Sequence, residues 1–366
     1  MGGGIDAQQY DKEMRPTGVA DEDGLVWHEP DREPMQLAGF WWYGRDRRYR
    51  RMPAQPAAPL PAAVDGLANS TAGGQIRFRT DSAHVAVRVE LAGPANMNHM
   101  PATGQCGFDL YAGPSGQARY CNTTKYDHSQ TRFQVELLNL PAPDLRDCTL
   151  YFPLYQGVRE VGVGLDAGAR LLPPAAWDLD APIAVYGTSI TQGGCAARPG
   201  MAYTNLLSRA LNAEVINLGF SGSGRGEPEV AQVIAEIEPC ALFVLDYEAN
   251  CQGTERLRET LPEFIRILRQ AQARTPILVV SRIRTPSELL NAEAVRGREE
   301  RQAFQRGLVE ELRAGGDDQI HFCDGATLLG DEDFEECTVD GSHPTDLGFL
   351  RMARNLEPVI RQVLDR

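Results

Sequence analysis

The first half of the chain alternates apolar and polar residues with a period of two. Four apolar residues occupy every second position of the segment 85–91, and the segment 133–137 repeats the pattern. Such alternation is typical of strands that bury one face. Clusters of Gly, Pro and Asn separate these segments from further short apolar stretches at 76–80, 108–111, 149–154 and 161–165. Short strands divided by turn residues predict an antiparallel, jelly-roll-like β-sandwich.

A different pattern begins after residue 182. Short apolar segments there alternate with segments whose apolar residues keep helical spacing, as in 203–211 and 356–364. The apolar segments lie at 183–186, 215–218, 241–246, 277–281 and 320–323. Alternating strands and helices predict an α/β domain in which helices cover both faces of a parallel sheet.

The segment 171–177 separates the two patterns. It contains Pro173 and Pro174, and adjacent prolines continue neither a strand ladder nor a helix, so we interpret it as a linker. A chain of 366 residues is also longer than a domain with a single hydrophobic core usually is. We therefore predict a β-sandwich domain over residues 25–172 and an α/β domain over residues 173–366.

Charge limits the classes of partner. The formal net charge of −14 argues against a nucleic acid or an anionic membrane, since both repel an acidic surface. The one basic cluster, at 45–51, includes an acid and has aromatic neighbours, which favours a solvated face or a packed arginine belt over a binding patch. We expect a small-molecule or carbohydrate ester as partner, and we leave a homo-oligomer open.

The sequence gives no sign of a membrane span or a leader. No run of eighteen apolar residues occurs, and the first six residues lack the basic start and apolar stretch of a secretory signal. We therefore expect a cytoplasmic protein, or a secreted one whose leader has been removed.

The eight cysteines indicate reduced thiols. They are scattered, with no C-x-x-C pair and no histidine at zinc-site spacing, so we predict neither a metal site nor a cofactor. A disulfide between Cys106 and Cys121 is the alternative that a secreted relative would use.

Two separate segments supply the groups that a serine hydrolase needs. The apolar strand at 183–186 runs into a turn that carries Ser189, and Asp340 and His343 lie three positions apart near the end of the chain. A serine nucleophile requires a base to deprotonate it and an acid side chain to orient that base. Ligands of open α/β sheets bind beyond the carboxyl ends of the strands, where these segments are predicted to meet.

Alternatives exist for the serine and the histidine, each taken alone. Ser189 can serve as a helix cap, and His343 can be a surface residue. The other histidine of the second half, His321, lies inside a predicted strand, whereas Pro344 favours an extended loop for His343. The combination of the three side chains favours the catalytic interpretation.

An ester hydrolase also has to stabilise the negative charge that develops on the carbonyl oxygen. The backbone N–H groups of Ser189 and Gly222 and the side-chain amide of Asn250 are the candidate donors, because each follows a different predicted strand. Gly222 suits a close approach of backbone to ligand, although a tight turn explains the glycine equally well.

In order and spacing, these residues resemble the SGNH (GDSL-type) hydrolase superfamily, with Ser189, Gly222, Asn250 and the pair Asp340 and His343 in its four blocks. The segment 107–111, which reads G-F-D-L-Y, is similar to the G-x-D-L-Y signature of a bacterial branch with an N-terminal domain. The resemblance implies a flavodoxin-like parallel sheet. In two places the sequence departs from the family: Thr188 replaces the usual aspartate before the serine, and Asn250 lacks its usual neighbours. We expect Asp246 to be a structural hydrogen-bond acceptor for these loops.

The resemblance implies a serine esterase that removes short acyl groups, above all O-acetyl groups from carbohydrates, with no cofactor or metal. Arg198, Arg225 and Glu227 flank the predicted loops and are candidates for binding sugar hydroxyls, with surface salt bridges as the alternative. The aromatic segment 41–43 fits a domain seam better than a sugar platform.

Other functions are compatible with the same residues. Within the esterase class they are an arylesterase, a thioesterase or an acyltransferase. From other classes they are a non-catalytic carbohydrate-binding protein, or a cysteine enzyme that uses Cys195 or Cys251.

Overall fold

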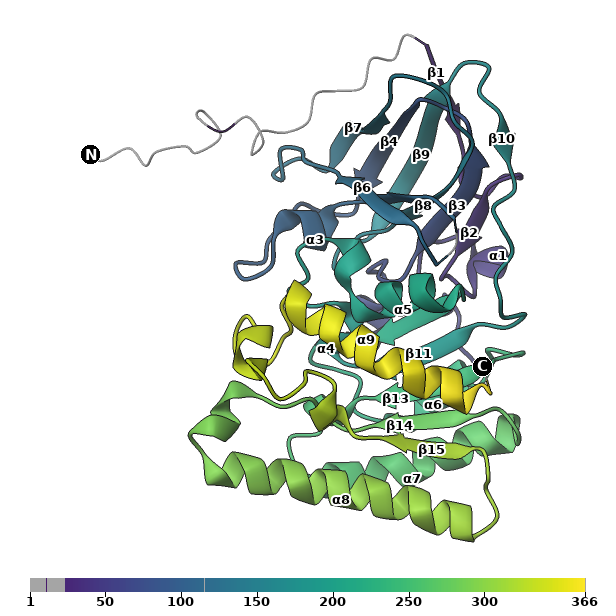
Figure 1. The fold of residues 1–366 in the computed structure, drawn as a ribbon. Coiled ribbons are helices and arrows are strands. Elements are labelled where there is room, and N and C mark those ends of the chain that lie inside the picture. Colours follow the sequence, from purple (N-terminus) through teal and green to yellow (C-terminus); the bar gives the residue numbers. More distant parts are fainter. Residues whose placement is uncertain (1–10, 12–23, 115, 366) are drawn as a thin grey trace.

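The structure is a computed structural model that describes residues 11, 24–114 and 116–365. Its N-terminal part is a sandwich of two antiparallel sheets (Figure 1). One sheet has the order β1-β9-β4-β7, with β1 at Leu25–His28, β4 at His84–Leu91, β7 at Arg132–Asn139 and β9 at Val158–Asp166. The other has the order β10-β3-β8-β5-β6, with β3 at Gln75–Thr80, β5 at Asp109–Ala112, β6 at Arg119–Thr123, β8 at Arg146–Tyr151 and β10 at Leu171–Leu172. Strand β2 (Gln36–Ala38) also pairs with β3.

The period-two pattern is confirmed by burial. In β4, Val85, Val87 and Leu91 are fully buried in the core between the two sheets, whereas Arg88 is exposed. Three short helices accompany the sandwich: α1 (Tyr43–Asp46), α2 (Ala62–Leu67) and α3 (Ala102–Cys106).

The C-terminal part is a five-stranded parallel sheet. Its order is β12-β11-β13-β14-β15, with β11 at Ile183–Gly187, β12 at Val215–Gly219, β13 at Leu242–Asp246, β14 at Ile277–Val280 and β15 at Ile320–Cys323. Counted within this sheet, the order is 2-1-3-4-5, which is that of flavodoxin-like folds. The predicted fold class is therefore confirmed.

Helices cover both faces of this sheet (Figure 1). One core lies under α4 (Ser189–Gln192), α5 (Tyr203–Leu211) and α9 (Asp346–Val363), and the other lies under α6 (Pro228–Ile234), α7 (Thr254–Ala271) and α8 (Ala292–Ala314). Alternate residues of β11 serve the two cores: Ile183 and Val185 enter the first, and Ala184 and Tyr186 enter the second. The loops contain the 3-10 helices η3 (Pro199–Met201), η4 (Glu248–Asn250), η5 (Pro286–Leu289), η6 (Gly325–Thr327) and η7 (Phe334–Cys337).

The interpretation of 171–177 as a linker was wrong at its first two residues. Leu171 and Leu172 form β10 and pair with Thr80 and Arg79 of β3. A two-residue ladder ends before Pro173, which has no N–H to donate. Strands β1, β2 and β6 were not predicted either, since their short polar-apolar mixtures carry no clear period.

Side chains from the basic and aromatic segments fill the seam between the two parts. Arg51 is fully buried, and its guanidinium donates to the carbonyl oxygens of Ser70 (2.8 Å), Leu67 (2.8 Å) and Gly219. Burial lowers the pKa of Arg51 to about 9. Trp42 is buried in the core shared with α6 and donates to Glu236 (3.3 Å). The packed arginine and the aromatic seam are thus confirmed for these two residues.

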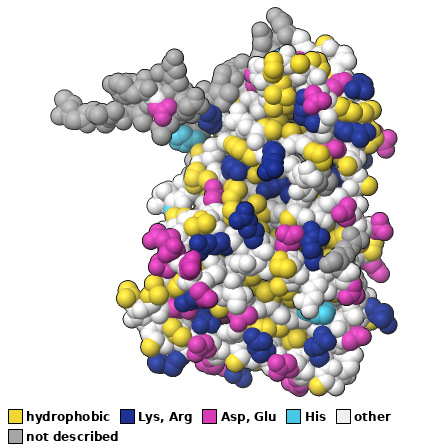
Figure 2. Space-filling model, in the orientation of Figure 1, with side chains coloured by type: hydrophobic (Ala, Val, Ile, Leu, Met, Phe, Trp, Pro, Cys, Tyr) yellow, Lys and Arg dark blue, Asp and Glu magenta, His cyan; other side chains and the backbone are white. Residues whose placement is uncertain are grey.

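Charged side chains of both signs are interspersed over the face shown in Figure 2. None of the helices in the described residues has the length and apolarity needed to cross a bilayer. All eight cysteines are free, including Cys106 and Cys121, so the alternative disulfide is not formed.

Candidate active site

Ser189 lies at the start of α4, directly after β11. Thr188 is the helix N-cap, and its hydroxyl accepts a hydrogen bond from the Ile190 N–H (3.2 Å). Because Ser189 is the first residue of α4, its own N–H has no acceptor within the helix. The residue is 7% exposed. Threonine thus caps the helix at the position where the family usually has aspartate.

Ser189, His343 and Asp340 form a continuous hydrogen-bonded chain. Ser189 Oγ lies 2.7 Å from His343 Nε2, and His343 Nδ1 lies 2.7 Å from Asp340 Oδ2. Asp340 Oδ1 accepts from the backbone N–H groups of Ser342 (3.0 Å) and His343 (2.8 Å). Burial acts to raise the pKa of Asp340, but the hydrogen bonds from His343 and Ser342 outweigh it and lower that pKa below its usual value. A hydroxyl placed in this way can be deprotonated by the imidazole while the carboxylate orients the ring.

The turn after α4 packs against the imidazole. The Gly194 N–H donates to Ser189 O (2.8 Å). A Cβ at Gly194 would lie 3.2 Å from His343 Cδ2 and 2.8 Å from the Tyr155 hydroxyl, so a side chain there would displace one of these groups. Glycine is therefore required for the observed packing.

The other two predicted donors lie in neighbouring loops at the same sheet edge. Gly222 has φ +64°, a conformation that favours glycine, and a Cβ there would meet no atom within 4 Å. Its N–H donates to no acceptor among the described residues. The Asn250 amide donates to Ser223 O and to Phe220 O (3.5 Å), so this side chain holds the turn that carries Gly222.

The three predicted sugar-binding residues all make contacts within the protein. Arg198 forms an ion pair with Asp109 (2.9 Å) and donates to the Tyr111 hydroxyl (2.5 Å). Glu227 accepts from the Tyr186 hydroxyl (2.5 Å) and from the Arg225 N–H (2.9 Å). The exposed Arg225 guanidinium donates to Gly222 O (2.8 Å). Arg198 therefore joins the sandwich to the α/β part, whereas Arg225 and Glu227 brace the Gly222 turn.

The sandwich brings two side chains to the site that the sequence did not indicate. The Tyr155 hydroxyl donates to Ser189 O (3.4 Å), and the exposed His99 ring lies 6.1 Å from the His343 ring, centroid to centroid. Both residues come from loops of the N-terminal half, outside the predicted α/β domain.

Asp246, at the end of β13, holds the helix that carries Ser189. Its Oδ2 accepts from the Tyr203 hydroxyl (2.7 Å) and from the Thr191 hydroxyl of α4 (3.2 Å). The expected structural role of Asp246 is thus confirmed. Burial raises its pKa to about 7, although both hydroxyls act to lower that pKa.

This raised pKa predicts a pH effect on stability. The folded state holds the Asp246 proton up to about pH 7, whereas the unfolded chain releases it near its ordinary pKa of 3.8. The stabilisation that Asp246 contributes is therefore complete below about pH 4 and declines by about 1.4 kcal/mol per pH unit until pH 7. Asp246→Asn, which keeps an acceptor for Tyr203, should lack this decline. We expect its melting temperature relative to wild type to be higher at pH 8 than at pH 5, and equal differences at the two pH values would contradict the assignment.

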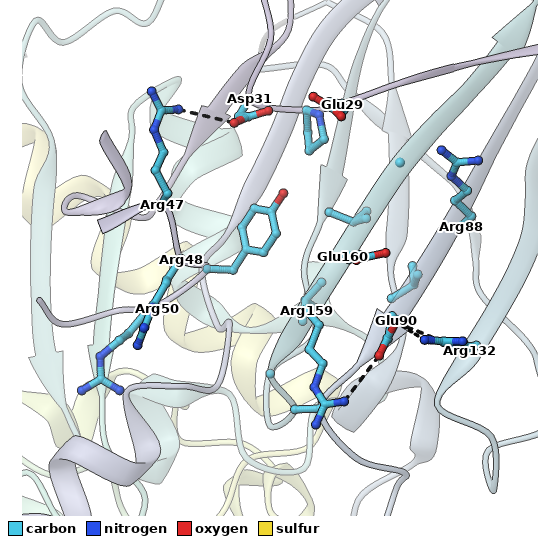
Figure 3. A pocket seen from close by; sticks show the side chains of 18 of the residues that line it. Glu29, Asp31, Arg47, Arg48, Arg50, Arg88, Glu90, Arg132, Arg159 and Glu160 are labelled. Carbon is cyan, nitrogen blue, oxygen red and sulfur yellow. Dashed lines mark hydrogen bonds and ion pairs between the residues drawn. The ribbon is translucent and has the colours of Figure 1, made fainter. Parts of the chain in front are cut away.

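A large cavity lies elsewhere, on the outer face of the β1-β9-β4-β7 sheet (Figure 3). Its volume is about 1210 Å³. Glu90 forms ion pairs there with Arg132 (2.7 Å) and Arg159 (3.4 Å), and Asp31 pairs with Arg47 (3.4 Å). The described lining contains no Ser, Thr or Cys, so it offers no nucleophile of the kind assembled at Ser189.

A flavodoxin-like sheet with serine, histidine and aspartate at its carboxyl edge defines an SGNH-type carboxylic ester hydrolase. The chain belongs to this family: residues 180–361 match the GDSL-like lipase/acylhydrolase family, and residues 25–171 match GxDLY, the N-terminus of SGNH-hydrolase-type esterases. No curated protein matches the chain significantly.

Several solved structures are similar to the chain over nearly their whole length. A GDSL-like lipase from Bacteroides ovatus is 27% identical, with a TM-score of 0.80 over 93% of this chain and 98% of the other. A salicylyl-acyltransferase from a tetracycline biosynthetic pathway is 22% identical, with a TM-score of 0.73 over 94% and 98%. An acetyl xylan esterase from Butyrivibrio proteoclasticus is 12% identical, with a TM-score of 0.57 over 94% and 99%. The last two likenesses concern the fold.

Proposed function

We propose that the protein hydrolyses short-chain esters, foremost acetyl groups on carbohydrates, through an acyl-enzyme on Ser189. The observation that supports this proposal is the hydrogen-bonded chain from Ser189 through His343 to Asp340. Each link is 2.7 Å long, which is within the reach that proton transfer requires.

The proposed reaction has two halves. His343 Nε2 takes the Ser189 proton as Oγ attacks the ester carbonyl, and Asp340 stabilises the imidazolium that forms. The imidazolium then protonates the departing alcohol oxygen, which leaves an acyl group on Ser189. In the second half, His343 deprotonates a water that attacks the acyl group, and the carboxylic acid leaves as Ser189 regains its proton.

We assign the oxyanion to three donors: the N–H groups of Ser189 and Gly222 and the amide of Asn250, which would exchange its 3.5 Å contact with Phe220 O for the oxyanion while it keeps the one with Ser223 O. The lack of a described acceptor for the Gly222 N–H supports its part in this assignment. The contacts of Arg225 and Glu227 with the Gly222 turn suggest that a bound sugar would lie beside these residues.

The acetyl-carbohydrate specificity draws on the likeness in fold, over nearly the whole chain, to a family two carbohydrate esterase from Cellvibrio japonicus and to the acetyl xylan esterase. The experiment that tests it compares kcat/KM for acetylated mono- and oligosaccharides with that for aryl and thio esters of the same acyl group. Higher values for the sugars would support the proposal. A clear preference for aryl or thio esters, or transfer of the acyl group to an added alcohol in preference to water, would replace it with one of the alternatives.

Asn250→Ala tests the third oxyanion donor. We expect kcat to fall by about 10²–10³-fold with a smaller change in KM, because the amide would act mainly in the transition state. The matched control is Asn69→Ala, which also removes an amide that donates to two backbone carbonyls, of Asp65 and Gly66, but does so in the sandwich. A lower melting temperature for Asn250→Ala with an unchanged kcat would assign Asn250 a structural role only.

A further inference from the structure

The fold brings two further metal-ligating side chains, His99 and Cys195, next to Asp340 and His343 of the candidate triad. His99 comes from a sandwich loop, Cys195 follows α4, and Asp340 and His343 precede α9. One ligand atom from each of the four lies within 4.8 Å of all the others. Spacing along the sequence predicted no zinc site, because the members come from three segments that only the folded chain brings together.

The donor set suits zinc. It combines two imidazoles, one thiol and one carboxylate, which are the ligand types that Zn²⁺ prefers, whereas a single carboxylate is a poor set for Ca²⁺ or Mg²⁺. Tetrahedral Zn²⁺ places its ligand atoms about 3.3–3.8 Å apart. The separations here are at most 4.8 Å, which exceeds that spacing by no more than about 1.5 Å, so a small side-chain movement would close the site.

The members of the cluster differ in freedom of movement. Cys195 is buried, and Asp340 is fixed by two backbone N–H groups. His99 is exposed, and its Nδ1 contacts the neighbouring Asn98 amide oxygen at 3.1 Å. Rotation of the His99 ring toward the other three ligands breaks only the exposed contact with Asn98. His99, which belongs to the sandwich, is therefore the ligand that can move most easily.

We propose that His99, Cys195, Asp340 and His343 bind one Zn²⁺ or a similar divalent cation, and that the bound metal switches the esterase off. Cys195 binds as a thiolate, and its proton leaves to solvent as the metal–sulfur bond forms. If the metal takes His343 Nε2, this atom can no longer accept the Ser189 proton. If the metal binds His343 Nδ1, the hydrogen bond from this atom to Asp340 is lost, and Asp340 no longer orients the ring.

The inhibitory half of this inference rests on the proposed function, whereas the binding half does not. Binding is therefore measured directly, by calorimetric titration of the full chain with ZnCl₂ after removal of metals. Ser189→Ala, which lacks the proposed nucleophile but keeps all four ligands, should bind Zn²⁺ as tightly as wild type.

Two variants test the ligand set. His99→Ala and Cys195→Ser should each weaken Zn²⁺ binding by about 10–100-fold or more. Loss of a residue that only supports a ligand already lowers metal affinity by that factor, and loss of the ligand itself should lower it at least as much. The matched controls are His128→Ala, an exposed histidine of the sandwich, and Cys251→Ser, a buried cysteine next to Asn250. Both controls should bind as wild type does.

Hydrolysis of a small acetate ester supplies the second readout. Saturating Zn²⁺ should abolish the activity of the wild type, and a chelator should restore it. His99→Ala should stay active at the Zn²⁺ concentration that inhibits the wild type. The site is refuted if wild type binds no Zn²⁺, or if both ligand variants bind it as tightly as wild type. Tight binding with undiminished hydrolysis would overturn the switch.

Discussion

Ser189→Ala should lower the turnover of a small activated acetate ester by about 10⁴-fold or more. The substitution removes the hydroxyl that is hydrogen-bonded to His343 Nε2 and leaves the base without a nucleophile to activate. Initial rates at saturating substrate measure the effect, and far-UV circular dichroism with a melting curve verifies that the variant is folded.

Ser342→Ala is the matched control for this prediction. Ser342 lies between Asp340 and His343 in the same loop, but its backbone N–H makes the contact with Asp340. Its activity should stay near that of wild type. A serine-directed phosphonate should label wild type and Ser342→Ala but not Ser189→Ala. Retention of most of the activity by Ser189→Ala would remove that residue from the mechanism.

Much of the candidate site could be predicted from the sequence because sheet topology determines where it forms. Parallel strands end at one edge, so Ser189 after β11, Gly222 after β12 and Asn250 after β13 had to come near one another. His343 could be placed by its neighbours, because the proline that follows keeps it out of α9. These assignments needed the order of strands and helices but no detail of side-chain packing.

The contribution of the sandwich to the site could not be predicted in the same way. His99 and Tyr155 lie in loops whose positions depend on how two separately patterned parts dock. No periodicity in the sequence encodes that docking. The same limit applies to Arg198: a charged residue after a helix is compatible with solvent, substrate or a partner from the sandwich until the partner, Asp109, is located.

The position of Asp109 gives the G-x-D-L-Y signature a physical meaning. Asp109 is fully buried in β5, and its Oδ2 accepts from Arg198 Nη1 (2.9 Å) and from the Gly200 N–H (2.8 Å). A Cβ at Gly200 would lie 2.4 Å from the Tyr111 ring, so the two segments touch closely. The loop that contains Arg198 and Gly200 follows α4. Asp109 of the signature therefore links the sandwich to the segment next to Ser189.

We expect Asp109→Ala to destabilise the protein by about 3–5 kcal/mol, because the substitution leaves the Arg198 guanidinium in a largely enclosed site without its carboxylate. Burial raises the pKa of Asp109, whereas Arg198 and the Gly200 N–H stabilise its charged form. Guanidinium unfolding followed by tryptophan fluorescence measures the loss, since Trp42 lies at the seam. Asp81→Ala, which breaks an exposed ion pair with Arg170 on the same sandwich, should cause a much smaller change.

The double variant Asp109→Ala with Arg198→Ala separates the ion pair from other effects of the substitution. If the cost of Asp109→Ala comes from an enclosed charge without a partner, removal of Arg198 as well should add little or even restore some stability. If the loss in the free energy of unfolding of the double variant equals the sum of the losses of the two single variants, the two side chains stabilise the seam independently. A loss for Asp109→Ala no larger than that for Asp81→Ala would refute the role of the signature as the joint between the two parts.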